Sequence, residues 1–406
     1  MRSIFCKSLW TLKTKSTKQC QVRHSNAVNQ IDARPPISEG GRVFNDDLLL
    51  NSGDLEYAAN QFPEAIHLID HPELRETFKK YEKVANGARA KVRLLGLLAV
   101  AFGTISLLSA VTEPFWHRMK SEAILTIVFE LCGMLAAVIA GGSLWLGPWR
   151  KQWLESRFMT ERLRQWHFQF LIRKGLEIDP IFFHPDTKTL QTFKAIRKKC
   201  FDEFLHDYEG KLDSRMESLV NDPDFSSDWL HRTQTPFSAN SIAIGHIYEI
   251  YRRLRFNQQY DYVTYKLSES TDRPLWQFLK WPLLRQETAI RGCVSFCFIA
   301  ALLCSVIVIV NRYFEIESSW GFYLGSATLG IAIVGISLRT IQDGLGITKD
   351  IERYRDYRGK VRRSLLQVEA TNDQQEKLEI MEDMEIAVVD ELRGFLRTHQ
   401  NAVFAL

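Results

Sequence analysis

The sequence lacks the short motifs that identify most soluble enzymes. None of the patterns GxxxxGK[ST], GxGxxG, GxSxG or CxxC occurs in the 406 residues, and no cluster of histidine, cysteine and carboxylate side chains stands out. A composition of 46% hydrophobic and 25% charged residues excludes intrinsic disorder and fibrous repeats. The formal net charge of +4 is too small to indicate nucleic-acid binding. We therefore expect neither an enzyme nor a protein with a cofactor, a metal or a nucleic-acid partner.

Charge is almost absent from four long blocks of the chain. The first block, Leu94–Thr112, has no ionisable residue over 19 positions, and the second, Ile124–Gly147, is interrupted only by Glu130. The third block, Gly292–Val310, and the fourth, Trp320–Leu338, are uncharged. A helix of 19 residues is about 28 Å long, close to the roughly 30 Å of bilayer hydrocarbon. The sequence therefore predicts four transmembrane helices and excludes a simple water-soluble enzyme. The alternative is that the blocks are buried core helices of a large soluble protein, which rarely reach 19 residues without a charged face.

The connections between these blocks predict two antiparallel hairpins. Only 11 residues (113–123) separate the first two blocks, and nine (311–319) separate the last two. Sixteen Lys and Arg residues lie within 15 positions of the outer ends of the blocks, against three in the short connections. Both termini and the middle segment should therefore face the cytoplasm or its equivalent. Four tryptophans lie at block ends, as in an aromatic belt: Trp116, Trp145, Trp149 and Trp320.

The remaining chain is predicted to be helical, so the fold class is an all-α membrane protein. In the C-terminal tail, apolar residues recur every three or four positions on two helices: Ile351, Tyr354, Val361, Leu365 and Val368, then Leu378, Met381, Met384, Val388, Leu392 and Phe395. Thr371 and Gln374 have capping-box spacing at the start of the second helix. These two helices should fold back on each other as a cytoplasmic pair.

The chain divides into six predicted segments. They are a basic, disordered tail (1–40), an amphipathic helical segment (41–93), the first transmembrane hairpin with the helix that follows it (94–174), a cytoplasmic helical segment (175–291), the second transmembrane hairpin (292–338) and the C-terminal helical pair (339–406). Residues 1–31 hold six Lys or Arg and no acid, which is also the character of a mitochondrial transit peptide.

Two features inside the blocks are candidates for function. Glu130 is the one ionisable residue within a block, which makes it a pore-lining candidate, unless the second span begins near Phe129 and leaves Glu130 at the interface. In the fourth block, five small residues follow four-three-four-three spacing: Gly321, Gly325, Thr328, Ala332 and Gly335. Such a seam lets another helix approach closely, so this span should face a neighbouring helix and support a homo-oligomer.

Three other patterns carry less information. His67, Asp70 and His71 resemble part of a zinc motif, but Pro72 follows at once and no third ligand is indicated. Cys293, Cys297 and Cys304 share a helix face in the third block, where we expect neither a disulfide nor a metal. The aromatic and basic residues of 248–265 have the composition of a nucleotide-stacking helix, but more often such aromatics lie in a core and the arginines on the surface.

The helix after the first hairpin carries a family resemblance. The run 153–168, with Trp153, Arg157, Glu161, Arg164 and Trp166, resembles the helix that follows the membrane hairpin in the SLATT superfamily, two-transmembrane effector domains of bacterial nucleotide-signalling conflict systems. The segment after the second hairpin, with Asp350, Arg353 and Tyr354, is similar in layout. The resemblance covers most of residues 73–398, although this chain has two hairpins and no attached sensor domain.

The resemblance implies a membrane-perturbing or pore-forming effector that a separate nucleotide-sensor protein triggers. Such an effector would lie in the bacterial inner (plasma) membrane, with the lipid bilayer and further copies of itself as partners. The basic, acid-free N-terminal residues leave a second hypothesis open, a structural or transport protein of the mitochondrial inner membrane.

Overall fold

The computed structural model describes residues 46–116, 127–128, 130–135, 138, 143–183, 186–222, 242–271, 273–314, 320–401 and 404. Over these residues the chain is helical and has no strand, which confirms the all-α prediction. Two compact units form: unit 1 comprises Met1–Lys79, Thr160–Tyr265 and Tyr354–Arg393, and unit 2 comprises Lys80–Met159, Lys266–Arg353 and Gly394–Leu406. The basic segment 1–31 lies outside the described residues.

Three helices are long and apolar enough to cross a membrane: α4 (Pro72–Trp116), α12 (Leu283–Tyr313) and α13 (Trp320–Gly344). They contain the first, third and fourth predicted spans. The second predicted span, Ile124–Gly147, lies partly outside the described residues, and its described part around Glu130 is helical. Helix α4 runs without a break past the predicted boundary between residues 93 and 94.

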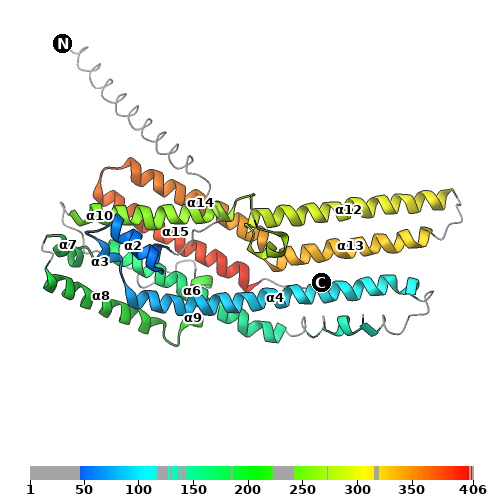
Figure 1. Ribbon diagram of the computed structural model, residues 1–406, viewed down its shortest axis with the longest axis horizontal. Coiled ribbons are helices and arrows are strands. Elements are labelled where there is room, and N and C mark those ends of the chain that lie inside the picture. Colours follow the sequence, from blue (N-terminus) through cyan, green and yellow to red (C-terminus); the bar gives the residue numbers. More distant parts are fainter. Residues whose placement is uncertain are drawn as a thin grey trace, which may run out of the picture. The chain divides into compact units, whose positions relative to one another are not determined.

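Helix α13 packs against two other helices within unit 2. It runs antiparallel beside α12 (Figure 1), and a Cβ added at Gly335 would lie 3.6 Å from Cys297 Cβ. Toward α4, the hydroxyl oxygens of Thr104 and Ser337 lie 2.6 Å apart. A Cβ at Gly330 would lie 3.4 Å from a methyl group of Leu108. Small residues and hydroxyls are the groups by which helices associate in lipid, so these contacts suit a membrane bundle.

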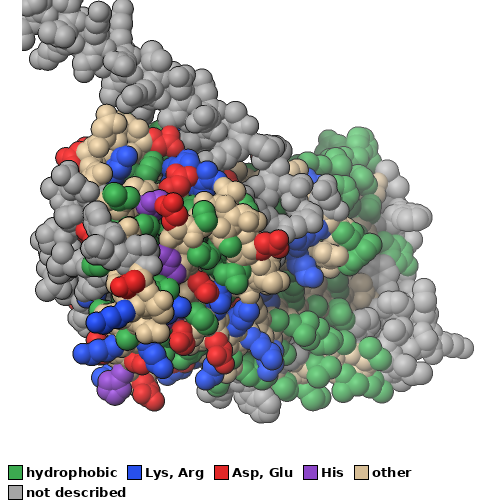
Figure 2. Space-filling model, turned by 60° about the vertical axis from the view of Figure 1, so that its left-hand side comes forward, with side chains coloured by type: hydrophobic (Ala, Val, Ile, Leu, Met, Phe, Trp, Pro, Cys, Tyr) green, Lys and Arg blue, Asp and Glu red, His purple; other side chains and the backbone are tan. Residues whose placement is uncertain are grey.

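The outer faces of these helices are apolar and exposed. No residue in the most apolar stretch of α12 is buried. Its exposed large side chains are Phe296, Phe298, Ile299, Leu302, Leu303, Val306, Ile307, Ile309, Val310 and Tyr313, and α13 adds Leu329 and Ile336. Figure 2 shows hydrophobic side chains gathered in a zone with few charges, whereas charged side chains are frequent on the rest of that face. A monomeric soluble protein rarely exposes so large an apolar surface, and this surface is compatible with a membrane protein.

Helix α6 (Ser143–Arg173) forms the core of unit 1 with its second half. Every residue from 158 to 172 is buried, and Trp166 packs on Phe170, Phe201 and Phe204 at ring-centroid distances of 5.0–6.0 Å. The helices around it are η1 (Asp46–Leu48), α2 (Ser52–Gln61), α3 (Ile66–Ile69), α7 (Gly175–Phe183), α8 (Thr187–Tyr208), α9 (Leu212–Asn221), α10 (Ile242–Tyr251), the π-helix η2 (Arg252–Asn257) and α11 (Gln258–Lys266).

Helices α14 (Ile347–Ala370) and α15 (Gln374–Gln400) form the predicted antiparallel pair (Figure 1). Their predicted apolar stripes are buried, except that Phe395 is half-buried. The capping box predicted from Thr371 and Gln374 is wrong. Helix α15 begins at Gln374, and Asp373 accepts the Gln375 N–H at 2.9 Å, while the Thr371 hydroxyl bonds Glu376 instead. An aspartate next to the helix start is the better N-cap.

Candidate functional site

The buried half of α6 is unusual because it is rich in polar groups. Its buried polar and charged side chains in unit 1 are Thr160, Glu161, Arg162, Arg164, Gln165, His167 and Gln169. Removing an ion from water costs several kcal/mol unless a partner of opposite charge and further hydrogen bonds offset the cost. The partners of these side chains therefore decide whether the arrangement is stable and what it can do.

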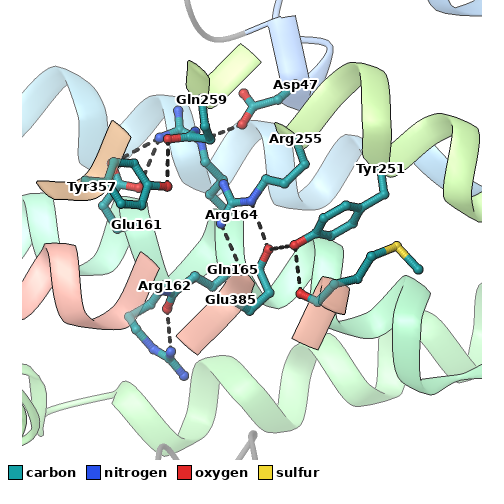
Figure 3. Close-up of polar contacts among 11 residues, drawn as sticks. Asp47, Glu161, Arg162, Arg164, Gln165, Tyr251, Arg255, Gln259, Tyr357 and Glu385 are labelled. Carbon is teal, nitrogen blue, oxygen red and sulfur yellow. Dashed lines mark hydrogen bonds and ion pairs between the residues drawn. The ribbon is translucent and has the colours of Figure 1, made fainter. Parts of the chain in front are cut away.

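Arg164 binds two carboxylates. Its Nε lies 2.7 Å from Asp47 Oδ2, and its Nη1 donates to Glu161 Oε1 and Oε2 at 3.0 and 3.1 Å. Asp47 comes from η1 and is fully buried, whereas Glu161 lies one turn before Arg164 on α6 (Figure 3). The guanidinium also stacks over the Phe78 ring at 5.3 Å. Arg164 thus links η1 to α6 through one guanidinium.

Arg255 and Glu385 form the second half of the site. Arg255 Nε and Nη2 donate to the two oxygens of Glu385 at 2.9 and 2.8 Å, and both side chains are almost completely buried. Tyr251 Oη donates to Glu385 Oε1 at 2.6 Å and lies 3.1 Å from the Met381 carbonyl oxygen. Burial lowers the pKa of Arg255, but the Glu385 carboxylate outweighs this effect and raises it overall. The Arg255 guanidinium is therefore charged at every physiological pH.

A π-helix positions Arg255. Residues 252–257 form η2 between α10 and α11, and such π segments interrupt α-helices often at functional sites. The wider turn directs Arg255 inward, where its guanidinium lies 4.9 Å from the Phe168 ring centroid. Tyr357 adds a contact from α14, because its hydroxyl donates to Gln259 Oε1 at 3.3 Å (Figure 3). Polar groups from seven elements, η1, α6, α10, η2, α11, α14 and α15, thus come together in the core of unit 1 (Figure 3).

The residues of the SLATT-like motif separate into two clusters, one in each unit. Glu161 and Arg164 belong to the ion network of unit 1, and Trp166 lies in the aromatic core beside it. Tyr354 contacts Tyr262 with its hydroxyl at 3.2 Å, also in unit 1. The remaining motif residues, Trp153, Arg157, Asp350 and Arg353, lie in unit 2.

The cluster of unit 2 is organised around His399. Its Nε2 lies 3.3 Å from Asp350 Oδ1, which also accepts from Arg353 Nη2 at 2.9 Å. The His399 ring packs on Trp153 and Phe395 at 4.9 and 4.6 Å. Burial would raise the pKa of Asp350, but the hydrogen bond from His399 and the charge of Arg353 outweigh it and hold the pKa at about 2. Asp350 is therefore ionised throughout the physiological range.

Gly346 makes the turn that places this cluster directly after α13. Its φ of +67° lies in the left-handed region, and a Cβ there would lie 3.3 Å from His399 Cε1. Both the backbone angle and the space favour glycine at this position. This packing site lies between the start of α14 and the end of α15, directly after α13.

The predicted residues inside the spans occupy different surroundings. Glu130 is helical and exposed, and nearby Gly133 is so close to α4 that a Cβ would lie 2.6 Å from Ser106 Oγ. Of the small-residue seam, Gly335 faces α12, whereas a Cβ at Gly321 or Gly325 would meet nothing within 4 Å. Ala332 is exposed and Thr328 donates to the Leu324 carbonyl. Part of the seam thus serves packing within the chain, and part of it faces outward.

The two histidines that resembled a zinc motif lie beside a cation. Arg197 Nη1 donates to the carbonyls of His67 and Leu68 at 3.1 and 3.0 Å, and its Nη2 donates to Asp70 at 2.8 Å. An arginine at the C-terminal end of α3 satisfies its last carbonyls and suits the helix dipole. Over the described part of the chain, no group of three His, Cys, Asp or Glu side chains has the arrangement of a metal site.

The chain was compared with protein-family models, curated proteins and solved structures. None matches it. Function is therefore inferred from the sequence and structure of the chain itself. Sequence reasoning found Glu161 and Arg164 through the motif, but it missed Arg255 and Glu385. The only signal was a basic and an acidic residue on amphipathic helices 130 positions apart in the sequence.

Proposed function

We propose that the chain is an integral membrane protein with four spans in two hairpins, which acts as a pore-forming or membrane-perturbing effector. The observation that carries the membrane assignment is the fully exposed apolar surface of α12. Exposing one large apolar side chain to water costs about 1.5–3 kcal/mol, so ten of them on one helix favour a lipid environment strongly. Lipid tails remove this cost without any protein partner.

The close contact of Gly133 with Ser106 supports the second span. It brings the Glu130 segment against α4, as a first hairpin requires. With four spans, the excess of basic residues at the outer ends favours an orientation with both termini and unit 1 in the cytoplasm. The spans would lie in a bacterial inner membrane.

The effector role rests on the SLATT-like motif and on the buried ion network. Burying a network of ions costs desolvation free energy, so such a network stabilises a helical core poorly. It can, however, specify one of two packings of the helices and so act as a switch. We propose that a separate nucleotide-sensor protein acts on unit 1 and changes this packing. Pore formation would need several copies, because four narrow spans do not enclose a water path by themselves.

Glu130 provides the functional test. If it faces water in a pore, Glu130→Gln removes the charge at nearly constant size and should change ion leakage from liposomes that contain the purified protein, as reported by a membrane-potential dye. Glu209→Gln, a change at an exposed acid of unit 1, should leave leakage as in wild type. Equal leakage in wild type and Glu130→Gln would place Glu130 at the interface. Wild-type leakage no greater than that of empty liposomes would refute the pore itself.

The outward part of the seam predicts self-association. Replacing Gly325 and Ala332 with leucine should reduce the oligomer mass measured in detergent by light scattering, because both positions are open to a second copy. Leu329→Ile alters the same face at constant volume and should preserve the mass. An unchanged mass after the double substitution would show that another surface holds the oligomer together.

A further inference from the structure

The segment before α12 holds two large apolar side chains in water. Residues Leu275–Lys280 form the short 3-10 helix η3, in which Trp276 is 85% exposed and Leu275 is 73% exposed. Neither belongs to a predicted membrane span or to the networks described above. Helix η3 lies within unit 2, and two residues separate its end from the start of α12.

A set of hydrogen bonds holds η3 in place. Trp281 Nε1 donates to the Pro274 carbonyl at 3.2 Å, which closes the segment at its two ends. Gln286 on α12 donates to the Trp281 carbonyl at 2.8 Å, and the Arg285 guanidinium lies 5.6 Å from the Trp281 ring. Prolines 274 and 282 fix the backbone on either side. The exposure of Trp276 is therefore built into a fixed segment joined to the first turn of α12.

The distance along α12 brings η3 close to the lipid headgroups. From Leu283 to Gly292, where the uncharged span begins, the helix rises about 14 Å. From Gln286, which holds η3, the rise is only about 9 Å, and the headgroup layer extends roughly 5–8 Å beyond the hydrocarbon. Tryptophan is the side chain most typical of this layer, and exposed Lys280 and Arg285, which follow Trp276 in the sequence, suit anionic headgroups.

We propose that η3 is a membrane-interface anchor, in which Trp276 and Leu275 insert into the headgroup layer beside α12. The proposal rests on the membrane assignment made above. A second copy of the chain is the poorer occupant, since two apolar side chains cover far less than the roughly 1,200 Å² that a stable protein interface buries. The inserted pair would fix how deeply α12 sits in the bilayer.

The test places a fluorescent amino acid in the full-length protein. Anap, whose emission shifts to shorter wavelength in apolar surroundings, replaces Trp276, Leu303 or Tyr57 in three variants reconstituted into liposomes of phosphatidylcholine and phosphatidylglycerol. Leu303 is a lipid-facing position of α12, and Tyr57 is an exposed aromatic of unit 1. Adding phosphatidylcholine that carries a doxyl quencher near its ester region reports contact with lipid.

At position 276, Anap should emit at shorter wavelength than at 57 and lose intensity with the quencher lipid. Polar, unquenched emission at 276 together with apolar emission at 303 would overturn the anchor and leave the span intact. Apolar but unquenched emission at 276 would mean that protein covers the site, which also overturns the anchor. Polar emission at both 276 and 303 would refute the membrane assignment together with the anchor.

Discussion

Glu385→Leu should destabilise the protein by about 3–5 kcal/mol. The substitution removes the partner of Arg255, whose guanidinium is fully buried and has no route to water. It also takes away the carboxylate oxygen that accepts the Tyr251 hydroxyl at 2.6 Å. Unfolding by urea in detergent micelles, followed by circular dichroism of the helical signal, measures the loss.

Two further variants separate charge burial from a general effect of substitution. Glu379→Gln changes an exposed carboxylate on the same helix and should shift the free energy of unfolding by less than about 0.5 kcal/mol. Arg255→Met combined with Glu385→Leu removes both charges and should recover most of the loss, because an apolar pair of similar volume needs no compensation. If the double variant is as unstable as Glu385→Leu alone, the ion pair contributes more to stability than the neutralisation of its two charges.

The elements of this fold could be predicted where apolar residues repeat at regular intervals. The stripes on α14 and α15 follow from spacing alone. Val361 and Leu365 on α14 are four positions apart, Met381 and Met384 on α15 are three apart, and all four are fully buried. The uncharged blocks likewise predict α12 and α13. Each of these signals depends only on residues that are near one another in the sequence.

The candidate site could be predicted only in part. The motif residues Glu161 and Arg164 interact at a separation of three, within reach of a local pattern. Arg255, by contrast, was expected on the surface with its neighbours Arg252 and Arg253 and lies in the core instead. Nothing local distinguishes the three arginines, because the π-helix and the pairing with Glu385 both depend on tertiary packing. Whether a charged side chain is buried or exposed depends on its partner, and the periodicity of the sequence does not reveal that partner.

The polar character of α6 shows the same limit. A run with Glu161, Arg162, Arg164, Gln165 and Gln169 has the composition of a solvated helix face, yet every one of these side chains is buried. Several different helices of unit 1 supply the groups that meet them, among them Tyr208, whose hydroxyl accepts from Arg162 Nε at 2.9 Å. Helix α6 is therefore a central element of unit 1, and its polar side chains pair with groups of other helices.

Lowering the pH from 6.5 to 5 should destabilise the protein by about 3 kcal/mol through two histidines. Burial lowers the pKa of His71 to about 2 and that of His167 to about 3, and the charge of Arg197 adds to both effects. In the unfolded chain each would titrate near 6.5, so below that pH the unfolded state binds more protons. Well below pH 6.5, the loss grows by about 1.4 kcal/mol per pH unit for each histidine until the folded-state pKa is reached.

The surroundings of the two rings explain why neither accepts a proton in the folded state. His71 packs between Trp166 and Phe201, at 5.5 and 4.8 Å, and is 2% exposed. His167 is 3% exposed, and Arg75, Arg197 and Arg255 all oppose a positive charge on it. The carboxylate nearest to either ring is Glu73, 3.7 Å from His71 Nε2, and it is too exposed to hold a buried imidazolium.

Matched variants assign the effect to these histidines. His71→Gln combined with His167→Gln should remove most of the slope of unfolding free energy against pH between 6.5 and 5, measured by urea titrations at several pH values in that range. Exposed His206, whose side chain is 82% accessible, provides the control, since His206→Gln leaves the buried charges unchanged and should preserve the wild-type slope. A wild-type slope in the double variant would mean that other groups take up the protons. A flat wild-type profile would show that both histidines titrate normally in the folded protein, with water or a carboxylate reaching their rings.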